Sequence, residues 1–440
     1  MNEPIRNLGR MCRRLRAGAL GLLTLAVMWG GLFYAMRWNG LRLLRQEDSQ
    51  RALQWFQAAS FLWPRSAENA ICKASAARRA GHLDLFEKYT REARRLGCPH
   101  AKLAWEQDLF DAQSGRMHQV SSLAGIRSIE EHVRHVIASR SEFEFPAREA
   151  LSKGLIQSFR LPEAEAELSA WIERAPGSFV ARLWLGQILI RVRQYPRAIQ
   201  NLIVALELKP HSSAAQFGLA QALHASGRSA EALPHLQKSL KERSQDAEAL
   251  ALIARCFQDQ GELAKAREFA TRAHRLAARD ASNLAILAQL DLAEDRLTEA
   301  LQWARLAVEA GPRERIPNHV LAEVLARLGK VEEATAARQV VQEIRKDWED
   351  FEEAQDQVLR EPLNPGPRLA IGLVLARNLN SQQAIRWILS ALAIDPDHVA
   401  SHNALADLYR QLGDLETAER HQQRARQLTA GIKETSAGVP

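Results

Sequence analysis

Cysteine is scarce in this chain of 440 residues, which has four in total and no pair in a CxxC arrangement. A zinc ribbon and a thioredoxin-like redox site both need such closely spaced thiols, so the sequence predicts neither. Cys12 precedes a long apolar run, and Cys256 is expected to be a buried thiol. Cys72 and Cys98 fall near the start and the end of one predicted hairpin, so a disulfide and two free thiols both remain open.

Strand patterns and catalytic motifs are missing as well. Alternating Val, Ile and Thr segments bounded by turn residues do not occur, which predicts an all-α fold. The sequence contains no HExxH, GxSxG or GxxxxGK motif and no GxGxxG after a strand, so we expect neither an enzyme nor a cofactor. His132 with His135 and His398 with His402 have helical spacing, but no further ligand lies nearby, so we expect surface histidines and no metal.

Excess charge is missing from most of the chain, although the formal net charge is +7. Residues 1–45 contain eight arginines against one glutamate, which leaves 51 basic and 51 acidic residues in the remainder. Such a balance is typical of a mixed solvated surface, so we do not expect nucleic acid as a partner. The excess defines residues 1–16 as a basic N-terminal segment.

Only one long apolar run is present. Residues 17–36 are uncharged, and as a helix they would span about 30 Å, the thickness of a hydrocarbon core. A single transmembrane helix is therefore expected, with a cleaved signal peptide as the alternative. Five arginines precede the run and three follow it closely, which favours a cytoplasmic N-terminus and a repeat domain outside the cytoplasm. In a Gram-negative-type bacterium that compartment would be the periplasm.

The dominant feature of the chain is a pattern that recurs every 34 residues, five times without insertion, between Phe179 and Trp348. One column holds a small residue in each unit: Ala198, Ala232, Ala266, Ala300 and Ala334. Twelve residues earlier lies a second small column: Gly186, Ala220, Ala254, Ala288 and Ala322. A break separates the halves of each unit at Arg193, Gly227, Gly261, Asp295 and Gly329. Apolar residues at three- and four-residue intervals around the break predict two short helices per unit, which must stack to bury their apolar faces.

These features resemble tetratricopeptide repeats. The unit that begins at residue 179 holds five residues in that family's register: Leu185, Gly186, Ala198, Ala205 and Pro210. Arg182 and Leu189 stand where the family often has aromatic residues. The resemblance implies a right-handed helical-repeat solenoid of antiparallel helix pairs, here preceded by one transmembrane helix, that binds proteins.

The register extends beyond the five central units. Residues 145–348 form the regular array, and residues 46–144 carry divergent helical repeats that include half a unit next to the apolar run. The period then breaks, and a second helix is expected to continue through residues 349–364 with an acidic face, which either docks a basic partner or is solvated. A C-terminal pair of units follows at 365–432, and 433–440 is expected to be a disordered tail.

In the tetratricopeptide family the first helix of each unit lines a concave groove, and its ninth position is informative here. That column reads Gln187, Gln221, Arg255, Gln289 and Glu323. An amide both donates and accepts, so a glutamine ladder could pair with the backbone of an extended peptide. Nearby positions are expected to receive apolar side chains of the peptide: Leu183, Ile190, Phe217, His224 and Leu292. The alternative is that glutamine is simply a good helix former on a wet face.

The sequence thus predicts a membrane-anchored scaffold that binds a protein or peptide in its groove, during assembly or maturation of an envelope complex. It lacks the Lys and Asn with which some relatives clamp a terminal carboxylate at the fifth and ninth positions. One alternative is a regulatory subunit that docks a membrane enzyme from the cytoplasmic side. Another is an enzyme without a recognisable motif, which would need polar residues gathered in a closed pocket rather than spread along an open groove.

Overall fold

The structure is a computed structural model, and it describes residues 28–117, 128–141, 143–158, 160–361, 363–378 and 380–437. The regular elements among these residues are helices, and no strand occurs in them. The chain divides into two compact units, one of Met1–Ala112 with Gln119–Ala150 and one of Gln113–His118 with Leu151–Pro440. We call them the N-terminal unit and the C-terminal unit and describe each by itself.

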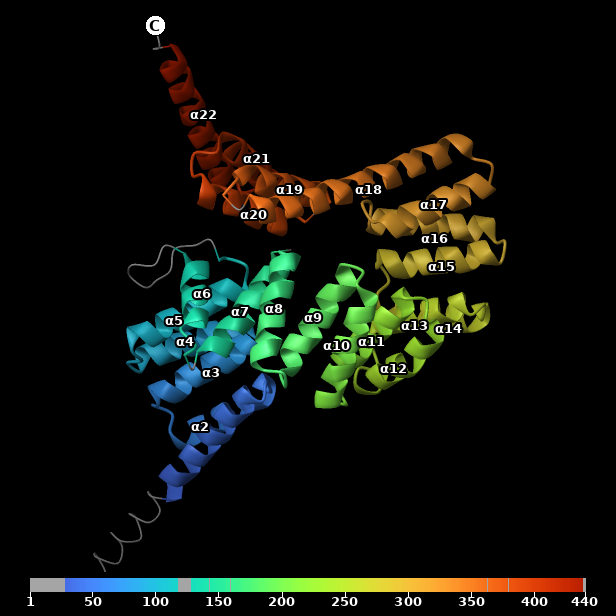
Figure 1. Ribbon diagram of the computed structural model, residues 1–440. Helices are drawn as coiled ribbons and strands as arrows, with labels where there is room; N and C mark the ends of the chain where they lie inside the picture. The colour runs from blue at the N-terminus through green and yellow to red at the C-terminus, as the bar shows by residue number, and fades with distance from the viewer. Residues whose placement is uncertain are drawn as a thin grey trace, which may run out of the picture. The chain divides into compact units, whose positions relative to one another are not determined.

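Among the described residues, the N-terminal unit begins with helical residues 28–45 and continues as a series of shorter helices (Figure 1). These are α2 (Ser49–Leu62), α3 (Ala67–Arg79), α4 (Leu83–Arg95), α5 (His100–Gln113), α6 (Ile129–Ala138) and the first half of α7 (Glu144–Gln157). Side chains of α2 to α5 share one core, in which the rings of Phe86 and Phe110 stack at 4.4 Å. Arg78 in α3, which has no exposed surface, pairs with Glu106 in α5 at 3.0 Å.

Three cysteines lie among the described residues, and all three are free thiols. Cys98 packs with Ala70, Ala93 and Leu103, whereas Cys72 lies against the core of α2 to α5. Burial raises the pKa of the Cys72 and Cys98 thiols above its ordinary value. Of the two possibilities that the sequence leaves open for this pair, the structure has the free thiols.

Residues 33–66 form a complete unit of the repeat, of which the sequence interpretation recognised only half. Gly40 lies one period of 34 residues before Ala74, a small residue of the next unit. A Cβ on Gly40 would lie 2.6 Å from a ring carbon of Phe56, so this helix approaches α2 so closely because the residue is glycine. The helix of residues 28–45, which includes the end of the apolar run, is therefore the first helix of this unit.

The predicted transmembrane helix lies largely outside the described residues, since 17–27 are not among them. Its remaining residues, 28–36, belong to the first helix of the N-terminal unit. None of the helices that the structure describes is both long enough and apolar enough to cross a membrane.

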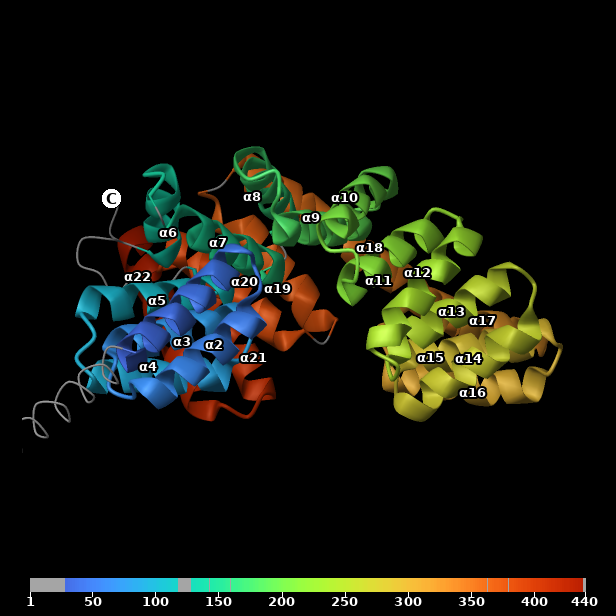
Figure 2. The same cartoon turned by 90° about the horizontal axis from the view of Figure 1, so that it is seen from below.

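The C-terminal unit is a stack of helical hairpins. After the end of α7 its helices are α8 (Leu161–Arg174), α9 (Phe179–Arg191), α10 (Tyr195–Leu208), α11 (Ser213–Ala225), α12 (Ser229–Glu242), α13 (Ala247–Asp259), α14 (Leu263–Leu276), α15 (Ala281–Ala293), α16 (Leu297–Ala310), α17 (Arg315–Arg327), α18 (Val331–Arg360), α19 (Pro365–Arg377), α20 (Ser381–Ile394), α21 (Val399–Gln411) and α22 (Leu415–Ala437). Consecutive helices from α8 onward pack against each other, and Figure 2 shows α13 to α17 side by side. The first helices also touch one another, from α9 through α11, α13 and α15 to α17. They form one continuous layer, which we call the first-helix layer.

Each central hairpin turns at a residue with positive φ, at the break that the sequence predicts. Gly227, Gly261 and Gly329 have φ between +74° and +79°, a region that glycine enters without steric cost. Arg193 and Asp295 adopt φ of 59° and 61° at the equivalent place, where a side chain costs roughly 1–2 kcal/mol. The turn is thus imposed by the packing of the two helices even where the residue does not favour it.

Capping residues one period apart start the first helices. The hydroxyls of Ser178 and Ser212 and the carboxylates of Asp246 and Asp280 each accept a hydrogen bond from a backbone N–H of the first turn. Such a cap stabilises a helix by about 1 kcal/mol. Glu314 occupies the same place before α17 and makes no side-chain cap.

The two small columns mark where helices cross most closely. The first column is buried completely or to within 1%: Ala198, Ala232, Ala266, Ala300 and Ala334. In the second column, a Cβ on Gly186 would lie 2.6 Å from Cγ of Leu202, which is itself fully buried. Close approach of helices at these columns is therefore confirmed, and it leaves no room for larger side chains there.

Helix α18 is 30 residues long and serves two hairpins. Its first half packs against α17, and its second half packs against α19, where Phe351, Ala354 and Val358 join the core of α19 to α21. Among the described helices, neighbouring first helices from α9 to α17 pack against each other, whereas α17 and α19 do not pack closely. The first-helix layer therefore ends at α17. Near the C-terminus, α22 continues to Ala437, into residues 433–440, which the sequence predicts to be a tail. Residues 438–440 of that segment lie outside the described residues.

Candidate binding surface

The ninth positions of five successive first helices form a column along the first-helix layer. Gln187 in α9 and Glu323 in α17 are exposed, whereas Gln221, Arg255 and Gln289 in the three helices between them are half-buried. Because each first helix touches the next, the column continues from helix to helix. All five side chains therefore keep surface that a partner can reach.

Carboxylates flank this column, and the sequence interpretation did not include them. Oε1 of Glu248 in α13 accepts a long hydrogen bond of 3.4 Å from Nε2 of Gln221 in α11. Glu248 and Glu314 are both exposed, yet the pKa of each is raised, first by desolvation and then by a neighbouring carboxylate, Asp246 and Asp280 respectively. An exposed carboxyl is desolvated in this way when protein surrounds it on several sides.

Acidic residues on the second helices behave differently. Glu231 in α12, Glu299 in α16 and Glu333 in α18 are exposed too, but hydrogen bonds from neighbouring side chains lower their pKa values. Desolvation acts in the opposite direction on each of them but is outweighed by these hydrogen bonds. Glu248 and Glu314 are therefore less hydrated than these second-helix acids, although all five side chains are exposed.

Arg255 is the one basic residue of the column. Burial lowers the pKa of its guanidinium, and the charges of Asp280 and Asp259 act in the opposite direction. None of the ion pairs within the described part of the chain involves Arg255. Its N–H donors are thus available to an acceptor such as a peptide carbonyl.

The residues expected to receive apolar side chains differ in accessibility. Leu183, Phe217 and Leu292 are only 5–9% exposed and contribute to packing within the array. Ile190 and His224 are half-buried. A partner can therefore contact little of the first three residues, and the accessible part of this surface is mainly polar.

His224 belongs to a polar cluster that joins α11, α12 and α13. Oγ of Ser229 donates to Oδ2 of Asp259 at 2.5 Å, and Nδ1 of His224 lies 3.1 Å from both oxygens. Sγ of Cys256 lies 3.9 Å from the same nitrogen. Burial, followed by the charge of Asp259, raises the pKa of the Cys256 thiol to about 12, so the thiol stays protonated at neutral pH. The cluster contains residue types found in catalytic sites, but its thiol is not activated.

The prediction that the helically spaced histidines lie at the surface is wrong for two of them. His132 is buried, and its Nδ1 lies 2.7 Å from Oδ2 of Asp108. His402 is buried between the carbonyl of Pro396, 3.0 Å from Nε2, and Nδ1 of His421 at 2.9 Å. Partners on other segments cover both rings. No group of three or more side chains that could hold a metal ion gathers among the described residues.

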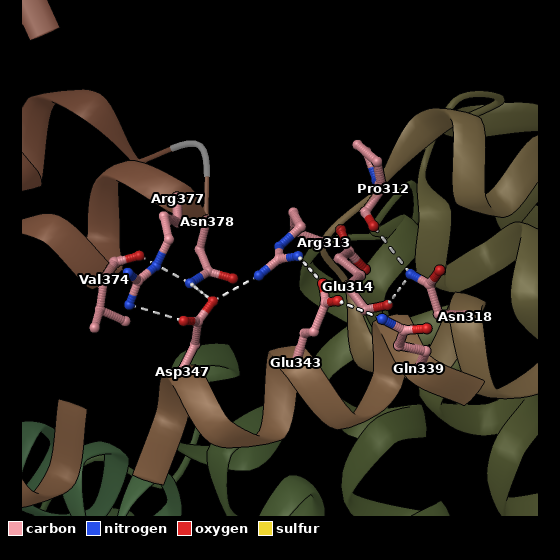
Figure 3. A network of polar contacts seen from close by, with 10 residues as sticks. All are labelled: Pro312, Arg313, Glu314, Asn318, Gln339, Glu343, Asp347, Val374, Arg377 and Asn378. Atoms are coloured by element: carbon pink, nitrogen blue, oxygen red, sulfur yellow. Dashed lines mark hydrogen bonds and ion pairs between the residues drawn. The ribbon is translucent and has the colours of Figure 1, made fainter. Parts of the chain in front are cut away.

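The acidic face of α18 is partly used within the molecule (Figure 3). Asp347 is 7% exposed, and it accepts from Arg313 at 2.6 Å, from Arg377 at 2.9 Å and from Asn378 at 3.3 Å. Arg313 precedes α17, whereas Arg377 and Asn378 lie at the end of α19. One carboxylate therefore connects the hairpins on the two sides of α18. The other acidic residues of this face remain exposed: Glu349, Asp350, Glu352, Glu353 and Asp356.

Comparison with known families identifies the repeats. Residues 191–256 and 223–290 match the tetratricopeptide repeat family, and residues 387–420 match a second description of the same repeat. These segments cover α10 to α15 and the region from α20 to α22. No protein of curated function matches the chain in sequence.

Several solved structures are similar over much of the chain. The human IFIT1 dimer with m7Gppp-AAAA has 15% identity and a TM-score of 0.41, over 83% of this chain and 90% of that one. Yeast Tom70 has 13% identity and a TM-score of 0.36, over 91% and 92%. PilW, a type IV pilus biogenesis factor, has 16% identity and a TM-score of 0.40, over 44% and 90%. At these values the similarities carry no argument about what the chain binds.

Proposed function

We propose that this chain, a tetratricopeptide-repeat protein, is a scaffold that binds an extended segment of a protein partner along the first-helix layer from α9 to α17. The continuity of that layer carries the proposal, because it aligns five accessible side chains of the ninth-position column on successive helices. Glu248, whose carboxylate accepts a hydrogen bond from Gln221, borders this column and supports the proposal by adding an acceptor beside it.

The chemistry of the layer favours a polar segment. Gln187, Gln221 and Gln289 offer amides that can pair with the backbone of an extended chain without reading its sequence. Glu248 and Glu314 favour basic side chains beside that backbone, because each acid already lies near another carboxylate. The partner segment is therefore expected to be extended, polar and basic.

A matched pair of variants tests this binding mode. Gln187, Gln221 and Gln289 are changed to alanine together, and a control changes three exposed glutamines of the second helices: Gln200, Gln237 and Gln302. The full-length chain is then used to capture its partner, and bound protein is quantified by mass spectrometry. We expect the first variant to lose capture and the control to retain it, with both equally folded by circular dichroism. Equal capture by the two variants would contradict the proposal.

The proposal also includes the cellular setting. Residues 17–36 form a single transmembrane helix, the N-terminus is cytoplasmic, and a right-handed solenoid outside the cytoplasm acts in the assembly or maturation of an envelope complex. The uncharged run and the five arginines before it support this topology. Protease added to intact spheroplasts is expected to digest the repeats. Repeats that stay intact until the membrane is opened would place them in the cytoplasm instead.

A further inference from the structure

Large apolar side chains are exposed together at one end of the first hairpin, on a surface separate from the first-helix layer. They are 48–85% exposed and comprise Met28, Trp29, Leu32, Tyr34, Phe61 and Trp63, which we call the aromatic cluster. The first four lie at the beginning of helical residues 28–45, and the last two lie at the end of α2. A contiguous apolar surface of this kind marks an interaction site.

Specific contacts hold the aromatic cluster together. The indole N–H of Trp29 donates to the carbonyl oxygen of Leu62 at 2.8 Å, across 33 residues of chain. The ring of Phe33, which is only 4% exposed, lies 5.4 Å from the ring of Tyr34 and 6.0 Å from that of Trp63. These contacts bring the beginning of one helix and the end of α2 together, so Trp29, Tyr34 and Trp63 lie near one another, and Phe61 lies two residues before Trp63.

The sequence on either side of the aromatic cluster indicates what covers it. Residues 17–27 of the apolar run lead directly into the helix that carries Trp29 and Tyr34. Trp and Tyr side chains are typical of the membrane–water interface, where the ring is apolar and its N–H or O–H stays wet. Arg65 lies two residues after Trp63, is exposed, and can reach lipid phosphates.

We propose that the aromatic cluster inserts into the bilayer leaflet next to the repeats, where Met28, Trp29, Leu32 and Tyr34 form the end of the membrane anchor, so that the end of α2 contacts lipid beside it. The inference rests on the anchor included in the proposed function. It adds that Phe61 and Trp63, which lie outside the apolar run, are lipid contacts. Two attachment points, the anchor and the end of α2, then fix the orientation of the first repeat at the membrane.

A depth-sensitive probe tests the proposal on the full-length chain. The chain is reconstituted into nanodiscs of phosphatidylethanolamine and phosphatidylglycerol, and an environment-sensitive fluorophore is attached at Phe61→Cys. The control carries the fluorophore at Leu363→Cys, a residue that is 82% exposed and lies after α18. A chain without an added cysteine reports labelling of the native thiols.

We expect the probe at residue 61 to shift its emission to the blue and to lose intensity when the lipids are brominated near their headgroups. The probe at residue 363 is expected to change in neither respect. A probe at residue 61 that is shifted but not quenched by brominated lipid is covered by protein, such as a second copy, and overturns the inference. A probe at residue 61 that stays exposed to solvent, on a chain that remains in the nanodisc, overturns the inference about α2 but agrees with the proposed membrane anchor. A chain that does not enter nanodiscs contradicts both.

Discussion

At the scale of single residues, Gly186 shows how closely the helices of one hairpin approach. We expect Gly186→Ala to lower the free energy of unfolding by about 1–3 kcal/mol, because the new Cβ would lie 2.6 Å from Cγ of the buried Leu202. The gain in helix propensity, about 0.5–1 kcal/mol, is too small to offset this overlap.

Gly218→Ala provides the matched control, since its Cβ would lie 3.2 Å from the end of the same Leu202 side chain. A small displacement of that methyl group relieves this contact, so stability is expected to change little or to rise. Both variants are compared with the unaltered chain by thermal and urea unfolding. A Gly186→Ala variant as stable as the Gly218→Ala variant would show that the crossing is looser than described.

The contact between buried His402 and half-buried His421 makes stability depend on pH. His402 donates from Nε2 to the carbonyl of Pro396, and its Nδ1 lies 2.9 Å from Nδ1 of His421. Burial, followed by the charges of His402 and Arg420, lowers the pKa of His421. The unfolded state then binds its proton at a higher pH than the folded state, so the free energy of unfolding falls as pH drops below about 6.5.

We therefore expect Tm of the chain to fall between about pH 7.5 and about pH 5.5, and to fall less in a His421→Gln variant. Some pH dependence remains in that variant, because burial also lowers the pKa of His224 and His235. Thermal unfolding followed by circular dichroism at a series of pH values measures the difference. Identical pH profiles for the two chains would show that this pair does not control stability.

At the scale of elements, α18 is the helix that departs from the period, and Asp347 holds it on both sides. We expect Asp347→Ala to destabilise the hairpins next to α18 by several kcal/mol, since Arg313 and Arg377 lose a shared and largely buried carboxylate. Hydrogen exchange should rise in α17 and α19 and change little in α11 to α13. Asp350→Ala is the control, because Asp350 is an exposed acid one turn along the same helix. Similar exchange in the two variants would mean that Asp347 does not connect the hairpins.

The elements also show what can be predicted from sequence. The turns and the close crossings follow from single residue types at fixed spacing, so Gly227 and Ala198 indicated them directly. Gly40 was missed because it adjoins an apolar run that suggests a membrane helix rather than a repeat. Asp347 was read as part of a solvated or docking face because its partner Arg377 comes from the unit beyond the interrupted period.

Burial of His402 and the desolvation of Glu248 were missed for a related reason. Each depends on neighbours from other segments, such as His421 for the first, and a single helix does not reveal them. The ninth-position column was predictable because it follows from the register alone. Its surroundings were not, so the mainly polar character of the surface and the packing role of Leu183 and Phe217 required the structure.

At the scale of the whole molecule, the chain is a tetratricopeptide-repeat scaffold with two distinct surfaces. The first-helix layer in the C-terminal unit is proposed to bind a protein segment, and the aromatic cluster in the N-terminal unit is proposed to bind lipid. The two surfaces lie in different compact units of the chain. Variants at Gln221 are therefore expected to affect partner capture without affecting the lipid contact of Phe61. Variants at Phe61 are expected to affect the lipid contact without affecting partner capture.

The most direct test of the central claim is site-specific photo-crosslinking in intact cells. A photoreactive amino acid replaces Gln221 on the first-helix layer or, as a control, Lys238, an exposed residue of the second helix α12. We predict a crosslinked protein from position 221, lost when Gln187 and Gln289 are also changed to alanine, and no crosslinked protein from position 238. A partner crosslinked from position 238 and not from position 221 would contradict the account.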